Sequence, residues 1–321
     1  MADHSQSTER ADLLADVAEM YYLEGKIQAK IAEKIGVTRS MVSRMLTEAR
    51  QQGIVEIKVN RKPYFDRDLS SALTERFGLK DAFVVANRYE SHERLLRLLG
   101  AAGAHVLDSY LAPGMTLGLV WGTTMNAVVE AVKARAIYPP VRIVQLSGAL
   151  DARSGVYDGH ALISRLAHQL SAEAFYLNSP LLVDDEEMVA ALSATPGIRE
   201  AIALARECDI ALLGIGGIDP QYCSYCLSGN ITPAQLQDFV QAGAVGVVYG
   251  RWFDRDGKPI DTKLYDRIIG IDLDDLLAIP VRIGIAGGAV KTRAIEGALR
   301  GGYVNVIITD SLVAADILAQ A

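Results

Sequence analysis

The chain of 321 residues is long enough for two domains, and its composition, 50% hydrophobic and 22% charged, is ordinary for a folded protein. No apolar run approaches the roughly 20 residues that a membrane span needs, and the polar N-terminal residues do not resemble a signal peptide. Three cysteines cannot form a disulfide framework, which agrees with a reducing compartment. We therefore expect a cytoplasmic protein that does not contact a membrane.

The net charge of −7 is unevenly distributed along the chain. Residues 1–62 carry ten Lys/Arg and nine Asp/Glu, for a net charge of +1, whereas the remainder carries 22 and 30, for a net charge of −8. Because an acidic body repels a phosphate backbone, we expect any nucleic-acid contact to be confined to the N-terminal head.

Three short helices are predicted in the head, because apolar residues recur there at helical spacing. The three stripes are Leu13, Val17, Met20 and Tyr21; Ile27, Ile31 and Ile35; and Val42, Met45, Leu46 and Ala49. Between the second and third stripes, Gly36 can adopt the left-handed conformation that ends a helix, and Thr38 can cap the next one.

The spacing of Ala32, Gly36 and Val42 is typical of a helix-turn-helix, in which a small residue, a turn glycine and a branched residue let two helices pack at an angle. The outward face of the third helix would then contact DNA, because arginine and hydroxyl side chains bind bases and phosphates. The alternative is a three-helix bundle with a solvated basic face. The predicted DNA-binding residues are Thr38, Arg39, Ser40, Ser43, Arg44 and Thr47.

The boundary between the domains is expected near residue 62. Residues 54–59 alternate like a short strand and would form a wing beside the helices, and Pro63 then prevents the strand from continuing. We therefore predict a DNA-binding domain at residues 1–62 and an effector-binding and oligomerisation domain at residues 63–321. A helix is predicted at residues 69–77, where it would help to pair two chains.

The large remainder alternates apolar strands with amphipathic helices, which predicts an α/β domain with a largely parallel sheet. Ligands of such sheets bind beyond the carboxyl ends of the strands. The segment GLVWGTT at 118–124 passes from a strand through a glycine into a helix, and so offers unpaired backbone N–H groups and the positive end of a helix dipole to an anion. The predicted strands are 82–86, 115–120, 141–147, 174–177, 210–215, 244–249, 281–285 and 304–308.

A set of motifs along nearly the whole chain resembles one known family. The motifs are YYLEGKIQAKIAEKIGVTRSMVSRMLTEARQQGIVEIKV at 21–59, GLVWGTT at 118–124, ALLGIGG at 211–217, GAVGVVYGRWFDRDG at 243–257, IAGGAVKTRAIEGAL at 285–299 and VIITD at 306–310. Together they resemble the SorC-type sugar-responsive bacterial transcriptional regulators, which are related to the deoxyribonucleoside-type repressors. The resemblance implies an N-terminal helix-turn-helix, a C-terminal effector domain shaped like sugar-phosphate isomerases, and homo-oligomers, dimers or tetramers, that bind operator DNA.

The family pattern makes Gly122, Thr123 and Thr124 a phosphate cradle and makes Lys291 the lysine that reaches the effector. The local chemistry agrees, because helix-start amides, hydroxyls and a compact positive charge suit phosphate oxygens. The alternative is that Thr123 only caps the helix and that Lys291 is solvated. Further candidates for effector binding are Gly216 in the ALLGIGG motif and, chosen only from their positions in loops, Gln145, Asp151 and Asp254.

One position departs from the family pattern. Where the family commonly places an acid that hydrogen-bonds sugar hydroxyls, this chain has Val247. The change removes acceptors and adds apolar surface, so the effector is expected to carry fewer hydroxyls there or to be held by other residues. A sensor of an unphosphorylated polyol stays an alternative.

The chain also offers residues for catalysis, which have to be weighed against sensing. A sugar-phosphate isomerase or deaminase needs a positioned carboxylate, lysine or histidine, and Asp254, Asp256 and Lys291 are candidates. The pair Cys223 and Cys226 lacks the second pair that structural zinc requires. We predict no catalytic residues, no metal and no cofactor, but a regulator of a carbohydrate-utilisation operon whose effector shifts operator binding; the alternative is an isomerase-like enzyme with a DNA-binding head.

Overall fold

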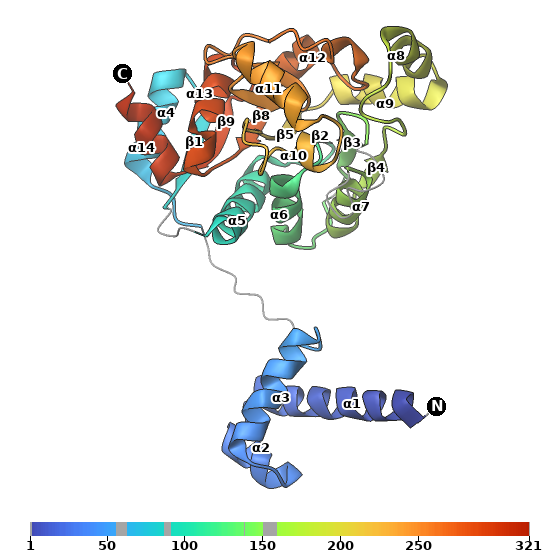
Figure 1. The fold of residues 1–321 in the computed structure, drawn as a ribbon, viewed down its shortest axis with the longest axis vertical. Coiled ribbons are helices and arrows are strands. Elements are labelled where there is room, and N and C mark those ends of the chain that lie inside the picture. The colour runs from blue at the N-terminus through green and yellow to red at the C-terminus, as the bar shows by residue number, and fades with distance from the viewer. Residues whose placement is uncertain (1, 56–62, 87–90, 138, 150–158, 321) are drawn as a thin grey trace. The chain divides into compact units, whose positions relative to one another are not determined.

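The computed structural model describes residues 2–55, 63–86, 91–137, 139–149 and 159–320, with the side chains described from Arg10 onward. Figure 1 shows the chain as two bodies, which are the compact units Met1–Arg61 and Lys62–Ala321. Residues 56–59 of the expected wing and the candidate Asp151 lie outside the described residues.

The first unit consists of the three expected helices, α1 (Ala2–Tyr22), α2 (Gln28–Ile35) and α3 (Arg39–Gln51). The predicted turn is confirmed: Gly36 ends α2 in the left-handed conformation with φ 71°, and the Thr38 hydroxyl accepts a hydrogen bond from the Met41 amide at 3.3 Å. The head closes a small core of its own, whose fully buried members are Leu14, Val17, Ile31, Val42 and Ala49. Three residues of the predicted stripes are wrong, because Leu13, Tyr21 and Ile27 are exposed and Leu14 takes the core position on α1.

The second unit is built on a parallel sheet of seven strands in the order β1-β9-β8-β5-β2-β3-β4. The strands are β1 (Asp81–Val85), β2 (Thr116–Leu119), β3 (Arg142–Gln145), β4 (Glu173–Phe175), β5 (Ile210–Gly214), β8 (Val281–Ile285) and β9 (Val306–Asp310). All four residues of β2 and the first four of β5 are buried, as expected for central strands of a parallel sheet that is covered on both faces. The predicted α/β architecture is therefore confirmed.

Helices connect the strands and cover the sheet. They are α4 (Arg67–Phe77), α5 (His92–Tyr110), α6 (Thr123–Ala131), α7 (Gly159–Leu170), α8 (Glu186–Ser193), α9 (Pro196–Arg206), α10 (Ser224–Leu227), α11 (Pro233–Gln241), α12 (Leu273–Ala278), α13 (Thr292–Arg300) and α14 (Ser311–Ala319), with short 3-10 turns η2 (Tyr265–Arg267) and η3 (Ala289–Lys291). Figure 1 shows α5, α6 and α7 side by side. The α5–α6 contact is close, because a Cβ on Gly100 would lie only 2.4 Å from the Ala127 carbonyl oxygen.

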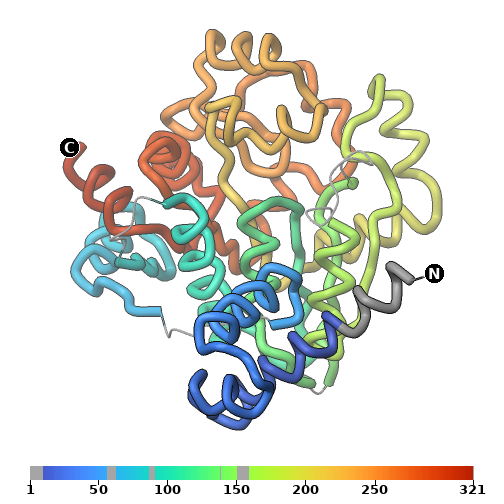
Figure 2. Tube along the Cα trace, turned by 60° about the horizontal axis from the view of Figure 1, so that its bottom comes forward, coloured from blue at the N-terminus to red at the C-terminus, as the bar shows by residue number. Residues whose placement is uncertain are grey.

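The helix that was expected to pair two chains is packed within its own unit. In Figures 1 and 2, α4 lies beside the C-terminal helix α14. The Leu73 side chain of α4 is fully buried, and Arg76 donates a hydrogen bond to the Ile317 carbonyl oxygen at 2.9 Å. The apolar face of α4 thus belongs to the core of the second unit.

One predicted strand lies outside the parallel sheet. Residues 244–249 were expected to join it, but β6 (Gly246–Val248) instead pairs antiparallel with β7 (Arg251–Phe253) in a separate hairpin. The physical reason is the two-residue turn between them: Tyr249 and Gly250 have φ 34° and 90°, which reverses the chain at once.

Among the described residues, no single helix is long and apolar enough to cross a bilayer. By length and composition alone, α8 and α9 pass such a test as a pair, with a bend of 90° between them.

Candidate functional site

A cavity opens where β2, β5 and β8 end and their loops begin. Its cavity volume is about 50 Å³, within a depression whose total empty space is about 550 Å³ with open solvent included. Gly122, Thr123, Thr124, Gly216 and Lys291, all predicted for effector binding, line this one cavity. The full lining is Val120, Trp121, Gly122, Thr123, Thr124, Met125, Gly214, Ile215, Gly216, Gly217, Tyr222, Cys223, Ser224, Tyr225, Val247, Tyr249 and Lys291.

The N-terminus of α6 forms one wall. Gly122 is its N-cap, in an unusual conformation with φ 136°, and no side chain caps the helix. The first bond of the helix runs from the Asn126 amide to the Gly122 carbonyl oxygen at 2.9 Å, so the amides of Thr123, Thr124 and Met125 have no acceptor within the helix. A Cβ on Gly122 would have no atom within 4 Å, so the backbone here is open to close approach.

Lys291 supplies the positive charge of the cavity. It ends η3, its amide donates to the Gly288 carbonyl oxygen at 2.9 Å, and its side chain is half-buried beside Gly217. Burial lowers the pKa of the Lys291 ammonium, and the nearby Cys223 thiol opposes that shift. Since the described lining contains neither an acidic residue nor a second lysine or arginine, the site is suited to an anion.

Aromatic side chains that the sequence did not single out complete the walls. Trp121, Tyr222, Tyr225 and Tyr249 all line the cavity, and the rings of Trp121 and Tyr225 lie 4.9 Å apart in an edge arrangement. The only sequence signal for Trp121 was its place directly before Gly122. The Val247 side chain, which is 3% exposed, forms the part of the cavity wall where the family pattern has an acid.

Two further effector candidates, Gln145 and Asp254, do not line the cavity. Gln145 is fully buried, and its Nε2 donates to the Ser147 carbonyl oxygen at 2.7 Å, which holds the loop after β3. The Asp254 carboxylate accepts from the amides of Asp256 and Lys258, both at 2.9 Å, and so closes the turn after β7. Neither residue lines the cavity, because each side chain is used to hold its own loop.

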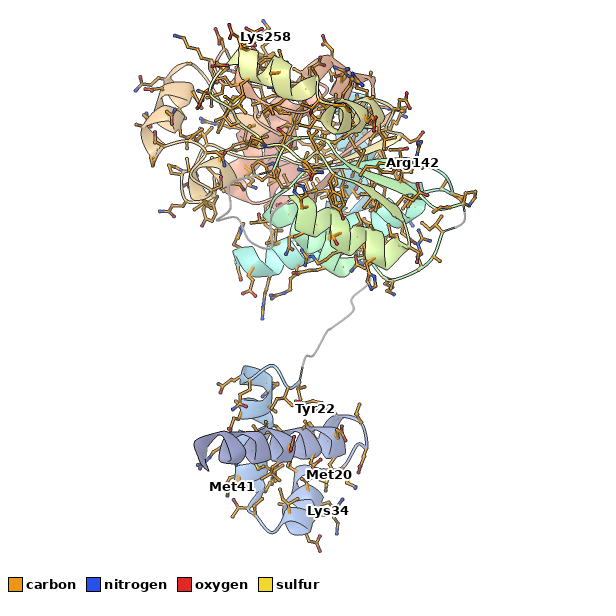
Figure 3. All side chains as sticks on the ribbon, turned by 90° about the vertical axis from the view of Figure 1, so that its right-hand side faces the viewer. Met20, Tyr22, Lys34, Met41, Arg142 and Lys258 are labelled. Atoms are coloured by element: carbon orange, nitrogen blue, oxygen red, sulfur yellow. The ribbon has the colours of Figure 1, made fainter. Side chains whose placement is uncertain are left out.

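The candidate nucleic-acid interface is the outer face of α3. All six predicted side chains are exposed: Thr38, Arg39, Ser40, Ser43, Arg44 and Thr47. Met41, labelled in Figure 3, is 45% exposed on the same helix. An ion pair between Arg10 and Glu48 at 2.6 Å joins α1 to α3, which also share the core of the head.

Comparison with known proteins identifies the family. Residues 61–319 match the Sugar-bind family model, which describes a sugar-binding domain. The chain is also 31% identical to the transcriptional regulator LsrR of Klebsiella pneumoniae, over 97% of this chain and 94% of that one. The chain belongs to the SorC-type family of sugar-binding transcriptional regulators.

Two further relatives support the assignment of this SorC-type regulator. The deoxyribonucleoside regulator of Bacillus subtilis is 31% identical over 94% of this chain and 96% of its own length. The crystal structure of the full-length sorbitol operon regulator SorC from Klebsiella pneumoniae superposes with a TM-score of 0.72 at 28% identity, covering 97% of this chain and 99% of that one. The resemblance seen in the sequence motifs is confirmed.

Metal chemistry has little support in the described part of this SorC-type regulator. No group of three or more His, Cys, Asp or Glu side chains converges there in a way that could hold a metal ion. Cys223 is buried in the cavity wall and Cys226 is half-buried beside it, with no further pair of ligands. The lining instead offers hydrogen-bond donors and one positive charge.

Proposed function

We propose that this regulator controls a carbohydrate-utilisation operon and senses a sugar phosphate in the cavity of its second unit. The observation that carries the proposal is the convergence of the uncapped N-terminus of α6 and Lys291 on one cavity. Backbone amides at a helix start and an ammonium group together form a binding site for phosphate oxygens.

Binding to DNA is assigned to α3 of the first unit. Its exposed face carries Arg39 and Arg44, which are available for phosphates and guanine edges. Operators of helix-turn-helix proteins usually consist of two half-sites, which require two heads, so we propose a homo-oligomer, a dimer or tetramer. Because operator DNA lies in the cytoplasm of a bacterium, we propose the same location for the protein.

We further propose that the cavity senses its ligand without transforming it. Moving a proton between adjacent sugar carbons needs a carboxylate, histidine or lysine held against the substrate. Of these, the described lining contains only Lys291, and Val247 stands where an acid would be. A ligand that binds one arrangement of the oligomer better than another then shifts operator binding by that difference in affinity.

The test is a thermal-shift screen of the full-length protein against sugar phosphates and their dephosphorylated counterparts. A ligand of the native state raises the melting temperature. Lys291→Ala should weaken binding of the phosphorylated ligand by about 10- to 150-fold, which is the loss of a charge-assisted hydrogen bond of about 1.5–3 kcal/mol. Lys258→Ala, which removes the same charge from the exposed lysine labelled in Figure 3, should leave binding unchanged.

Preference for a free sugar or polyol, combined with normal binding by Lys291→Ala, would contradict the phosphate site. Turnover of a sugar phosphate by the purified protein, abolished in Lys291→Ala, would contradict the assignment as a sensor.

A further inference from the structure

The N-terminal turn of α5 lies at the mouth of the cavity. The ring of His92, the first residue of α5, has its centroid 5.2 Å from that of Tyr222, which lines the cavity and is partly exposed. One turn further on, Leu95 lies against the loop that precedes Lys291, because a Cβ on Gly288 would be 3.5 Å from Leu95 Cδ2. His92 therefore stands beside the anion site although it is not part of the lining.

The electrostatics place His92 within the field of Lys291. Burial, and secondly the positive charge of Lys291, lower the pKa of His92. Among the described residues near it, His92 faces the Tyr222 ring, and its acidic neighbour on the helix, Glu93, is paired with Arg97. His92 thus lies within the electrostatic range of Lys291 and in ring contact with Tyr222 of the cavity lining, which sets it near the anion site.

The dianionic form of a phosphate monoester carries more negative charge than the cavity lining supplies. At neutral pH that charge is about −1.5 to −2. Lys291 provides one positive charge, and a helix N-terminus is equivalent to roughly half a charge. The lining therefore leaves part of a dianion uncompensated, and a protonated imidazole at the mouth would supply the missing charge.

We propose that His92 is a second cationic contact for the anionic group of the effector, and that it makes effector binding stronger at mildly acidic pH. This inference rests on the proposed function, because it presupposes an anion at Lys291. It assigns a binding role to a residue that none of the sequence motifs contains.

The direction of the pH effect follows from the linkage between proton binding by His92 and anion binding. In the free protein the lowered pKa leaves His92 largely neutral near pH 7. An anion bound between His92 and Lys291 stabilises the imidazolium, so binding takes up a proton and the affinity rises as the pH falls. One proton allows a change of at most about tenfold per pH unit.

Sulfate is the suitable probe, because it stays a dianion over this range, whereas a phosphate monoester itself titrates near pH 6. With the full-length protein, calorimetry should show sulfate binding that tightens by at least about threefold between about pH 8 and pH 6. His92→Asn should flatten this profile. His92→Lys, which carries a charge at both pH values, should bind tightly at both, and His168→Asn, on the exposed face of α7, should keep the parental profile.

The outcomes distinguish the role of His92 from the existence of the anion site. If Lys291→Ala loses sulfate binding while His92→Asn keeps the parental pH profile, the role of His92 is overturned and the anion site stands. If sulfate binding does not depend on Lys291, the proposed anion site itself is overturned.

Discussion

Gly216 and Val247 exchange two backbone hydrogen bonds, from the Gly216 amide to the Val247 carbonyl oxygen at 2.9 Å and from the Val247 amide to the Gly216 carbonyl oxygen at 3.0 Å. The pair joins the loop after β5 to the β6–β7 hairpin and fixes the Val247 side chain in the cavity wall. A Cβ on Gly216 would lie 2.6 Å from Val247 Cγ1, so glycine is required for this close approach. The cavity wall at this point is therefore apolar, and its backbone is held in place by the two hydrogen bonds.

Val247→Asp should lower the free energy of unfolding by about 2–4 kcal/mol at neutral pH, because it places a carboxylate at a position that is 3% exposed. Burial raises the pKa of such a carboxyl in the folded state, so the penalty is present above the unfolded value of about 4 and disappears below it. Urea denaturation at about pH 7 and pH 4 measures the difference. Val247→Thr is the control with nearly the same volume, and equal stability of the Asp variant and the parent at both pH values would show that the wall is solvated.

Gly214→Val should block the cavity without straining the backbone. Gly214 lines the cavity, its φ is not in the left-handed region, and a Cβ there would meet no atom within 4 Å. The branched side chain would therefore project into the ligand space, so the thermal shift by the effector should be lost while operator binding persists. Gly197→Val, at another open glycine outside this cavity, should keep the thermal shift. An effector response in Gly214→Val equal to that of the parent would place the ligand elsewhere.

Local rules made much of the fold predictable from sequence. The turn in the head follows from two neighbouring residues, since Gly36 supplies the left-handed conformation and Thr38 the cap. The parallel sheet was predicted because apolar strands alternate with amphipathic helices along the chain. The hairpin at 246–253 was missed because Tyr249, a non-glycine residue with φ 34°, gives no turn signal in the sequence.

Residues of the candidate site were predictable only where they belong to a recognisable sequence motif. Gly122 and Thr123 follow from the strand-to-helix break, which is a local pattern. Gln145 and Asp254 were chosen from loop position, which does not show whether a side chain is already used to hold its own backbone. His92 lies far from Tyr222 in the chain, and only the folded sheet brings them together.

Thr38→Ala should destabilise the start of α3 by about 1 kcal/mol, because the Met41 amide loses its acceptor. Hydrogen exchange of the α3 amides in the full-length protein measures this as a loss of protection. Thr38→Ser retains a hydroxyl and should restore most of it. Identical protection in Thr38→Ala and the parent would show that the cap does not contribute.

Arg39→Ala and Arg44→Ala should each weaken operator binding while leaving effector binding intact, because both side chains are exposed on α3. A contact to phosphate adds about 0.9 to the slope of log affinity against log salt, so its loss should reduce the slope by about 1 and weaken all sequences alike. A contact to a base should instead cost about 1–3 kcal/mol and relax specificity at one position. Fluorescence anisotropy with an operator selected from a random-sequence library, at several salt concentrations, distinguishes the two. Arg255→Ala, an equal loss of charge at an exposed site in the second unit, is the matched control, and parental affinity in both α3 variants would show that α3 does not contact DNA.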